Sequence, residues 1–443
     1  MERSGATPVT MLGAALAVGL PLASCAVSPP TITLDDDVAT LALANWTGGT
    51  NERTRVEVDG EDGPFLRTDW QDPELAHSVP LLGLWAGGKW SARVVSESGE
   101  GSVYVDFETG TVPVGMPGWT TSGTPGWEGY LLTGVIAEPA WALILDEWGR
   151  VVWYKKALGR HRVLRLRLRA DGEGLRFAEI EPAPVTETSA LVTVNWDGSE
   201  VSRHQVDQFN HDFVDTPEGD SICVVTDVRP GRSGADVVGD ALVRVDEDGV
   251  ATPIWSTWDT WEVPEDSELE GDTWAHVNAL DTREGGGWWV GMRNLSALLE
   301  VFDDGSTGRM LGGPDSDWSF AVEADRPKFQ HQFQFLDGGV VMMDDRDPST
   351  GEDSRVLELT LDDAAMSATA TWSWHHDPPL SIVTLGDVDR AADGSTLAVF
   401  SYAGVIDDIG PDGELRWELQ TSLAAAIPYA VVVADLPGVT RVR

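Results

Sequence analysis

The sequence predicts an all-β protein: a six-bladed β-propeller preceded by a small β-sandwich. The composition favours this class, because 47 glycines and 20 tryptophans among 443 residues are typical of chains with many tight turns and large side chains between sheets. A turn that recurs roughly every 50 residues after Gly118 indicates repeated units of blade size. Before that point, apolar and polar residues alternate as they do in half-buried strands.

The repeated turn contains an Asp, usually followed by Gly, and often precedes a Trp. A second glycine turn lies between successive copies, so each unit has about four antiparallel strands, as a propeller blade does. Six copies fit within residues 118–443, which we expect to form the propeller domain. The copies begin at Asp146, Asp197, Asp248, Asp304, Asp362 and Asp412, and the copy at Asp362 has no Gly.

Residues 1–25 are typical of a bacterial lipoprotein signal peptide. Arg3 precedes an apolar run, Met11–Leu22, that is too short to span a membrane as a stable helix. The run ends in Leu22-Ala-Ser-Cys25, which resembles a lipobox, so we expect Cys25 to become a lipidated N-terminus that tethers the protein to a membrane. The expected location is the cell envelope, either periplasmic or anchored to the outer membrane. An ordinary secretory signal that happens to contain a Cys is the alternative.

A linker and a sandwich domain are predicted between the signal and the propeller. Residues 26–37 contain prolines and an acidic run typical of a linker, and residues 38–113 show strand-like alternation. The segment Val79–Val94 resembles the E–F corner of a fibronectin type III sandwich, with Trp90 where a Tyr is usual. Within it, Gly83 to Lys89 matches the start of a phosphate-binding loop. Trp90 stands where Ser or Thr would hold Mg²⁺, so nucleotide binding is not expected.

Acidic residues dominate the charge of the chain. The 73 acidic residues against 30 basic ones give a formal net charge of −43, which opposes binding to nucleic acid or to anionic lipid surfaces. The acidic residues are scattered through turns, so we interpret them as a solvated surface. After removal of the signal, Cys223 has no partner for an intrachain disulfide.

Three of the eight histidines occupy nearly the same phase of the repeat. His211, His276 and His331 each begin a short strand-like run that ends in a glycine turn. Because the first strands of propeller blades surround the central channel, we expect these side chains at one channel mouth. Arg293 ends the strand after His276 and should return to the same rim, where Asn278 lies on the same side of its strand as His276. An arginine fork beside three imidazoles predicts a site for an oxyanion.

Two other interpretations compete with this one. The histidines can cap strands and satisfy backbone groups, which is the commoner role for any one of them alone. Three histidines can also bind catalytic zinc, but Arg293 beside them would oppose a cation, so no metal is expected. A serine hydrolase is not indicated, since no Gly-x-Ser-x-Gly turn stands near the histidines.

Several segments resemble the bacterial arylsulfotransferase family, whose members are periplasmic and do not use nucleotide sulfate donors. The most specific are Trp274-Ala-His276-Val-Asn278 and Arg293-Asn-Leu-Ser-Ala297. The likeness covers the whole propeller and, more loosely, the sandwich before it. The other matching segments are Leu143–Trp153, His211–Phe213, Leu311–Gly313, Phe329–His331, Ser354–Val356 and Gly386–Arg390.

The resemblance implies a ping-pong transfer of a sulfuryl group from a phenolic sulfate ester to a phenolic acceptor. It implies that His331 is the nucleophile that becomes a sulfohistidine. It also implies that His211, His276 and Arg293 bind sulfate oxygens and help to protonate the leaving phenolate. Asn278 is expected to take part in substrate binding, and no cofactor or metal is required. A compact spacing from Arg293 to His331 distinguishes this chain from the larger members, which carry longer insertions around the mouth.

Two rival functions follow from the same residues. One is a non-catalytic propeller lipoprotein that binds a polymer or a protein partner at the cell surface. The other is a metal-dependent hydrolase or lyase that uses the histidines. The expected partners are a small-molecule phenolic sulfate and a phenol, whose identities the sequence leaves open together with the oligomeric state, a homodimer included.

Overall fold

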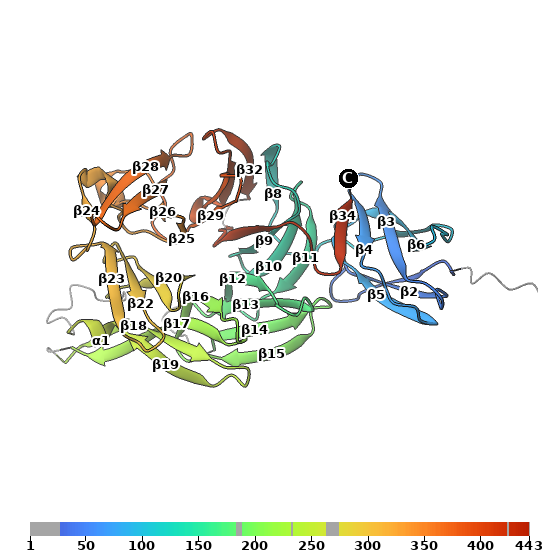
Figure 1. The fold of residues 1–443 in the computed structure, drawn as a ribbon, viewed down its shortest axis with the longest axis horizontal. Coiled ribbons are helices and arrows are strands. Elements are labelled where there is room, and N and C mark those ends of the chain that lie inside the picture. Colours follow the sequence, from blue (N-terminus) through green and yellow to red (C-terminus); the bar gives the residue numbers. More distant parts are fainter. Residues whose placement is uncertain (1–26, 183–187, 232–233, 263–273, 423–424, 443) are drawn as a thin grey trace, which may run out of the picture.

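The computed structural model describes residues 27–182, 188–231, 234–262, 274–422 and 425–442 (Figure 1). The predicted signal peptide and Cys25 lie outside the described residues. Apart from strands, the described part contains one short α-helix, α1 (Thr257–Thr260), and three 3₁₀ turns. The all-β class predicted from the sequence is therefore confirmed. Within the same residues, no helix has the length and apolar character needed to cross a membrane.

The N-terminal region consists of two sheets that share one hydrophobic core, at the right of Figure 1. Alternation builds this core, since every second side chain of β5 is buried. The rings of Trp85 and Trp90 meet inside it at 4.0 Å between centroids. One sheet has the order β1 (Thr31–Leu34), β2 (Ala42–Thr47), β5 (Ala76–Leu81). The other has the order β34 (Val439–Val442), β4 (Phe65–Thr68), β3 (Thr54–Gly60), β6 (Lys89–Ser96), β7 (Val105–Glu108).

The C-terminal strand β34 lies in the N-terminal region. It pairs with β4 and places Val439 opposite Thr68. The range 118–443, which we expected to form the propeller, therefore contributes its last strand to the N-terminal sheet. Arg441 of this strand also donates to the carbonyl oxygen of Gly129 at 2.6 Å and forms an ion pair with Glu147. The end of the chain thus fastens the two regions together.

Residues 119–433 form six sheets, which are antiparallel except that β24 joins its sheet in parallel. The first is β33 (Ala430–Val433), β9 (Tyr130–Val135), β10 (Trp141–Asp146), β11 (Val151–Lys156). The second and third are β12 (Arg162–Leu168), β13 (Gly174–Ile180), β14 (Ala190–Asn195), β15 (Glu200–Gln205), and β16 (Phe209–Asp215), β17 (Ser221–Pro230), β18 (Asp236–Val245), β19 (Ala251–Ser256). The fourth is β20 (Val277–Thr282), β21 (Trp288–Met292), β22 (Ala297–Val301), β23 (Thr307–Gly312). The fifth is β25 (Phe333–Leu336), β26 (Gly339–Asp344), β27 (Arg355–Asp362), β28 (Ser367–Trp374), β24 (Ser319–Phe320). The sixth is β29 (Asp387–Arg390), β30 (Thr396–Phe400), β31 (Val405–Ile409), β32 (Leu415–Thr421), β8 (Trp119–Gly123).

The six sheets follow one another in a closed circle. The strands β9, β12, β16, β20, β25 and β29 each contact the next in this order, and β29 also contacts β33 of the first sheet. These strands gather at the centre of the larger body in Figure 1. Two strands from distant parts of the chain close the circle, because β8 pairs with β32 and β33 pairs with β9. This circular order is the arrangement of a β-propeller.

The six Asp turns identified in the sequence occupy one equivalent position. Each joins the third and fourth strands of its sheet. In the five turns with glycine, the glycine is left-handed, with φ from 77° to 84°, a conformation that glycine adopts without steric cost. The strand register shifts in every one of these third-to-fourth pairs. The sequence repeat therefore marks a turn next to which the strand register shifts.

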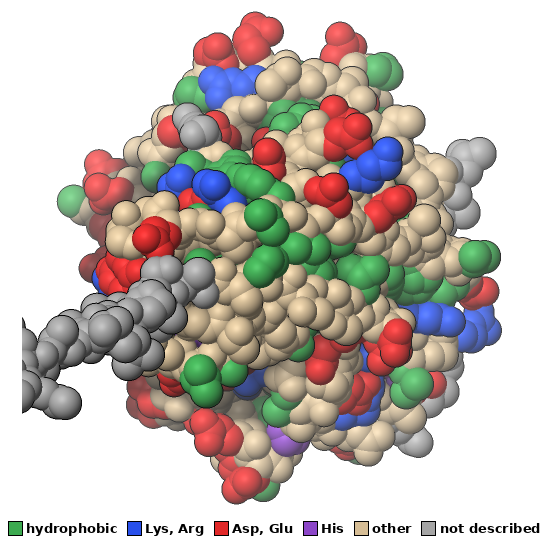
Figure 2. All heavy atoms as spheres, turned by 90° about the vertical axis from the view of Figure 1, so that its right-hand side faces the viewer, with side chains coloured by type: hydrophobic (Ala, Val, Ile, Leu, Met, Phe, Trp, Pro, Cys, Tyr) green, Lys and Arg blue, Asp and Glu red, His purple; other side chains and the backbone are tan. Residues whose placement is uncertain are grey.

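Acidic side chains are dispersed over the molecular surface that Figure 2 shows. This view faces the end of the molecule that carries the N-terminal sheets. Asp and Glu side chains are spread across the face with Lys and Arg between them, and hydrophobic side chains appear among them. The scattered distribution expected from the sequence holds for this face.

Candidate functional site

Two of the predicted histidines lie side by side at the centre of the circle of sheets. His211 is in β16, and His276 directly precedes β20 of the next sheet. Their rings meet edge to face, with 4.8 Å between centroids. Both residues have φ of 53°, in the left-handed region that L residues rarely adopt. Such backbone strain is concentrated at functional sites in proteins.

The third histidine, His331, has its ring fixed at both nitrogens. It precedes β25 and is only 2% exposed. Its Nδ1 lies 2.7 Å from Oδ2 of Asp345, and the backbone N–H of Leu385 donates to its Nε2 at 2.7 Å. An amide N–H can only donate, so Nε2 must be the acceptor and the ring hydrogen must be on Nδ1. The neutral imidazole therefore donates to Asp345 and keeps its lone pair on Nε2.

The surroundings keep His331 neutral. Burial is the main cause that holds the pKa of His331 well below its usual value, because the charged form loses its hydration. Repulsion from Arg293, His276 and His211 lowers this pKa further, which also shows that these predicted residues are near the ring. An imidazole that stays neutral at physiological pH can act as a nucleophile.

The carboxyl group of Asp345 is equally enclosed. It is 1% exposed, and its pKa is raised well above the usual value, mainly by burial. Arg293 opposes this shift and Asp344 adds to it. The Oδ1 atom of Asp345 has no hydrogen-bond partner among the described residues. The hydrogen bond to His331 is thus the interaction that the structure shows for this carboxyl group.

Arg293 is held beside His276 by the backbone. It follows β21, and its N–H donates to the carbonyl oxygen of His276 at 3.0 Å. Its guanidinium donates to Oδ1 of Asn294 at 3.1 Å and to the carbonyl oxygen of Val383 at 2.5 Å, and lies over the ring of Phe329. No carboxylate of the described residues forms an ion pair with it. The cation is therefore available to an anionic ligand.

Asn278 is directed at the backbone that leads into His331. It is 2% exposed, and its Nδ2 donates to the carbonyl oxygen of Gln330 at 2.9 Å. The Gln330 side chain is also buried and donates to the carbonyl oxygens of Met292 and Ala297. In this structure Asn278 positions the segment that leads into His331. Its expected role in substrate binding stays a prediction.

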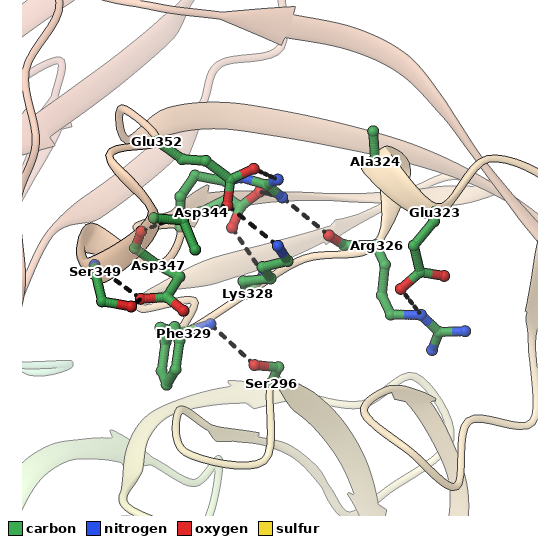
Figure 3. A network of polar contacts seen from close by, with 12 residues as sticks. Ser296, Glu323, Ala324, Arg326, Lys328, Phe329, Asp344, Asp347, Ser349 and Glu352 are labelled. Atoms are coloured by element: carbon green, nitrogen blue, oxygen red, sulfur yellow. Dashed lines mark hydrogen bonds and ion pairs between the residues drawn. The ribbon is translucent and has the colours of Figure 1, made fainter.

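A network of polar contacts fixes the segment before His331 and the residues on both sides of Asp345 (Figure 3). The backbone N–H of Lys328 donates to Oδ1 of Asp344 at 2.8 Å, and that of Phe329 to the hydroxyl of Ser296 at 3.1 Å. Arg346 forms ion pairs with Asp344 and with Glu352. The residues directly before His331 and on both sides of Asp345 are thereby held in place, which preserves the contact between the two side chains.

The side chain of Asp212 links neighbouring strands near the histidines through hydrogen bonds. Its Oδ1 accepts from Nε of Arg165 at 3.1 Å, and its Oδ2 accepts from the backbone N–H of Leu280 at 3.1 Å and from Nε2 of Gln332 at 2.9 Å. The four residues come from β12, β16, β20 and the segment before β25. Buried polar groups that are satisfied in this way fix a single arrangement of the strands.

A second buried histidine pairs with a carboxylate elsewhere. His376, in the loop expected for His375-His376-Asp377, donates from Nδ1 to Oδ2 of Asp407 at 2.8 Å, and its Nε2 is 4.0 Å from Glu418. Among the described residues, these three side chains form the group close enough to hold a metal ion. The alternative zinc site at His211, His276 and His331 is a different set of residues. The hydrogen bond to Asp407 raises the pKa of His376, so the two carboxylates favour the protonated imidazole.

Sequence reasoning missed Asp345 and the segment around Leu385. Asp345 follows the fully buried strand β26 at the sequence Met343-Asp-Asp345-Arg346. Charged residues directly after an apolar run were the available signal, and the acidic composition of the chain hid it. The role of Leu385 comes from its backbone N–H, which no residue type reveals.

Comparison with protein families identifies the chain. The profile of the family described as arylsulfotransferase (ASST) matches residues 129–409, a range that contains all three histidines and Arg293. The chain belongs to the arylsulfotransferase family. The resemblance inferred from the segments around His276 and Arg293 is confirmed. A comparison with curated proteins found no match.

Solved structures with similar coordinates include three proteins of low identity. A protein of unknown function from Bacteroides caccae is 11% identical, with a TM-score of 0.43, over 69% of this chain and 98% of that chain. Virginiamycin B lyase from Staphylococcus aureus is 8% identical, with a TM-score of 0.37, over 70% of this chain and 100% of that chain. The PQQ-bound aldose sugar dehydrogenase from Streptomyces coelicolor is 12% identical, with a TM-score of 0.37, over 69% of this chain and 100% of that chain.

Proposed function

We propose that this arylsulfotransferase family member moves a sulfuryl group from a phenolic sulfate ester to a phenol through a sulfohistidine at His331. One observation carries the proposal. The buried His331 ring donates its Nδ1 hydrogen to Asp345 and turns its Nε2 lone pair to a segment that Arg293 also contacts. Attack on a sulfate ester requires a lone pair that reaches the sulfur atom and a cation, here a guanidinium, beside it.

In the first half-reaction, Nε2 of His331 attacks the sulfur atom. The bond between sulfur and the aryl oxygen breaks, and its electron pair leaves with the phenolate. A proton from His276 or His211 reaches the phenolate oxygen, so a neutral phenol departs. Asp345 stabilises the positive charge that develops on the His331 ring, since it already accepts the Nδ1 hydrogen.

In the second half-reaction, the acceptor phenol replaces the donor. It gives its proton to the histidine that was deprotonated, and its oxygen attacks the sulfur atom. The N–S bond breaks and its electron pair returns to Nε2 of His331. Arg293 binds sulfuryl oxygens through both steps, because its planar fork of donors matches them. Neither a metal nor a cofactor takes part in these steps.

We extend the proposal to the architecture and location of the protein. The circular order of six sheets supports a six-bladed β-propeller, and the two N-terminal sheets support a fibronectin-III-like sandwich. Lipidation of Cys25 would place the enzyme at the periplasmic side of the cell envelope. Mass spectrometry of membrane-extracted protein is expected to find an acylated Cys25 at the N-terminus, and a mature chain that begins elsewhere would contradict this.

The decisive experiment uses 4-nitrophenyl sulfate as donor and phenol as acceptor. Without acceptor, we expect one burst of 4-nitrophenol and one sulfuryl adduct, which peptide mapping locates on His331. His331→Ala abolishes both, whereas His375→Ala, a matched change at an exposed histidine, leaves both unchanged. A chelator has no effect on transfer. Loss of activity with the chelator would favour the metal-dependent hydrolase, and absence of any burst would favour the non-catalytic binding protein.

A further inference from the structure

The segment Val383–Leu385 forms hydrogen bonds to the two groups that the reaction needs, Arg293 and His331. The Val383 carbonyl oxygen accepts from Nη2 of Arg293 at 2.5 Å, where a sulfuryl oxygen would bind. The Leu385 N–H donates to Nε2 of His331 at 2.7 Å, where the sulfur atom would bind. A sulfuryl group and this backbone segment cannot be present at the same time.

Both ends of this segment are anchored. On one side, the buried Ile382 donates its N–H to the hydroxyl of Ser354 at 2.9 Å, and Ser354 donates to the carbonyl oxygen of Asp345. On the other side, Asp387 begins β29 and accepts from the backbone N–H of Ala430 at 2.9 Å. A movement that clears the site can therefore be confined to the residues between the two anchors.

The segment itself has little to hold it in place. The side chain of Val383 is 51% exposed, and that of Leu385 is not part of the buried core. Leu385 has φ of 59°, which costs a residue with a Cβ about 1–2 kcal/mol. The following Gly386 has φ of 132°, a conformation essentially limited to glycine, and so provides a flexible joint. Apart from the chain on either side, this segment is held by its hydrogen bonds to Arg293 and His331.

We propose that Val383–Leu385 is a latch that covers the sulfuryl site in the resting protein and is displaced by the sulfate group of the donor. The inference rests on the proposed function of His331. The Val383 carbonyl imitates a sulfuryl oxygen on Arg293, and the Leu385 N–H caps the nucleophile. Binding of the donor replaces both hydrogen bonds, so the nucleophile is exposed only when a sulfate group is there to react.

The test compares two substitutions at one position. Leu385→Pro removes the N–H and cannot adopt the left-handed φ, so it opens the latch. Leu385→Ala keeps the N–H and the same backbone requirement, so it is the matched control. The probe is diethyl pyrocarbonate, which acylates accessible imidazole nitrogens, and peptide mapping follows His331 with the exposed His375 as internal reference.

We expect the reagent to modify His331 about tenfold faster in Leu385→Pro than in the wild type, and at the wild-type rate in Leu385→Ala. Tenfold is the ratio that a hydrogen bond of ordinary net strength produces when it holds the closed form. Should Leu385→Pro fail to fold, Gly386→Ala decides. A Cβ at φ of 132° is strained and would lie 2.8 Å from Cγ of Met343, so residue 386 has to shift and the same joint is displaced. Equal rates in the loosened variant and the control would overturn the latch, as would a wild-type His331 that reacts as fast as His375.

A kinetic readout separates the latch from the proposed function. With 4-nitrophenyl sulfate, Leu385→Pro is expected to lower KM about tenfold, since the donor no longer has to displace the latch. If the acylation pattern holds while no variant forms a sulfuryl adduct, the latch stands and sulfotransfer is wrong. If sulfotransfer is observed but acylation and KM do not respond to Leu385→Pro, the latch is wrong and the function stands.

Discussion

Two buried histidines of this protein have nearly the same carboxylate contact and opposite electrostatics. His331 donates to Asp345 at 2.7 Å, and His376 donates to Asp407 at 2.8 Å. The pKa of His331 is lowered, mainly by burial, whereas the pKa of His376 is raised, mainly by the hydrogen bond to its carboxylate. The carboxylate partner alone therefore does not set the charge of a histidine.

Besides the stronger effect of burial on His331, the two histidines differ at the other ring nitrogen. Nε2 of His331 accepts from a backbone N–H, and Arg293 is the cation nearby, so a second proton is opposed. Nε2 of His376 faces Glu418 at 4.0 Å, and Asp377 adds a further negative charge, so a second proton is favoured. The same pair of side chains thus favours a neutral imidazole in one place and a protonated one in the other. Substitutions at equivalent positions of the two dyads test this distinction.

The largest contrast is expected between Asp345→Asn and Asp407→Asn. An amide at position 345 can donate to Nδ1 of His331, which moves the ring hydrogen to Nε2 and removes the attacking lone pair. We expect sulfuryl transfer to fall by about 10³–10⁴-fold, as it does when a tautomer-fixing carboxylate is replaced elsewhere. Asp407→Asn should leave the rate of transfer unchanged. The burst of 4-nitrophenol in single turnover measures both, and a fast burst from Asp345→Asn would show that this carboxyl group does not fix the tautomer.

Arg293→Lys is expected to have the next largest effect. An ammonium group cannot reproduce the planar fork of donors, so the activation free energy of transfer should rise by about 2–4 kcal/mol. The comparison with Arg309→Lys, an arginine that pairs with Glu300 on the outer strands, controls for a general effect of the substitution. Steady-state kcat/KM for 4-nitrophenyl sulfate gives the result. Equal rates for Arg293→Lys and the wild type would mean that sulfuryl oxygens do not bind this guanidinium.

The pH dependence of transfer sharpens the comparison further. Because the pKa of His331 lies well below its usual value, the acidic limb of kcat/KM should fall well below pH 6.5, the ordinary range of a histidine. Arg293→Met removes one of the repulsive charges and should shift this limb to higher pH while lowering the rate. A limb at the ordinary histidine position in the wild type would be inconsistent with the buried, neutral nucleophile.

The fold was largely predictable because each repeated unit contains a turn that the sequence shows by its residue types. The Asp turns from Asp146 to Asp412 appear in the sequence, and each joins the third and fourth strands of a sheet. The position of β34 was not predictable. Its four residues, Val439–Val442, would suit an edge strand of either region. The pairing with β4 and the contacts of Arg441 with Gly129 and Glu147 show how the chain end is held.

The site was predictable as far as residue type and phase carry information. The three histidines and Arg293 stand out in the sequence, and the structure brings them together. Asp345 did not stand out, since its local signal, an acidic residue directly after an apolar run, is hidden among 73 acidic residues. The cap on His331 could not be inferred at all, because it depends on the backbone conformation of Leu385.

The smallest expected effect concerns the stability that His376 provides. Its pKa is raised in the folded protein, so its contribution is fully present below the unfolded value near pH 6.5 and is lost as pH rises through the folded value. His376→Gln removes the charge and keeps an amide donor. The loss of unfolding free energy on this substitution should be about 1–2 kcal/mol at pH 5.5 and smaller at pH 8.5. Urea unfolding at the two pH values measures it, with His375→Gln as the matched change at the exposed neighbour. A loss that grows with pH would mean that His376 is buried as a neutral ring, and the contrast with His331 would then disappear.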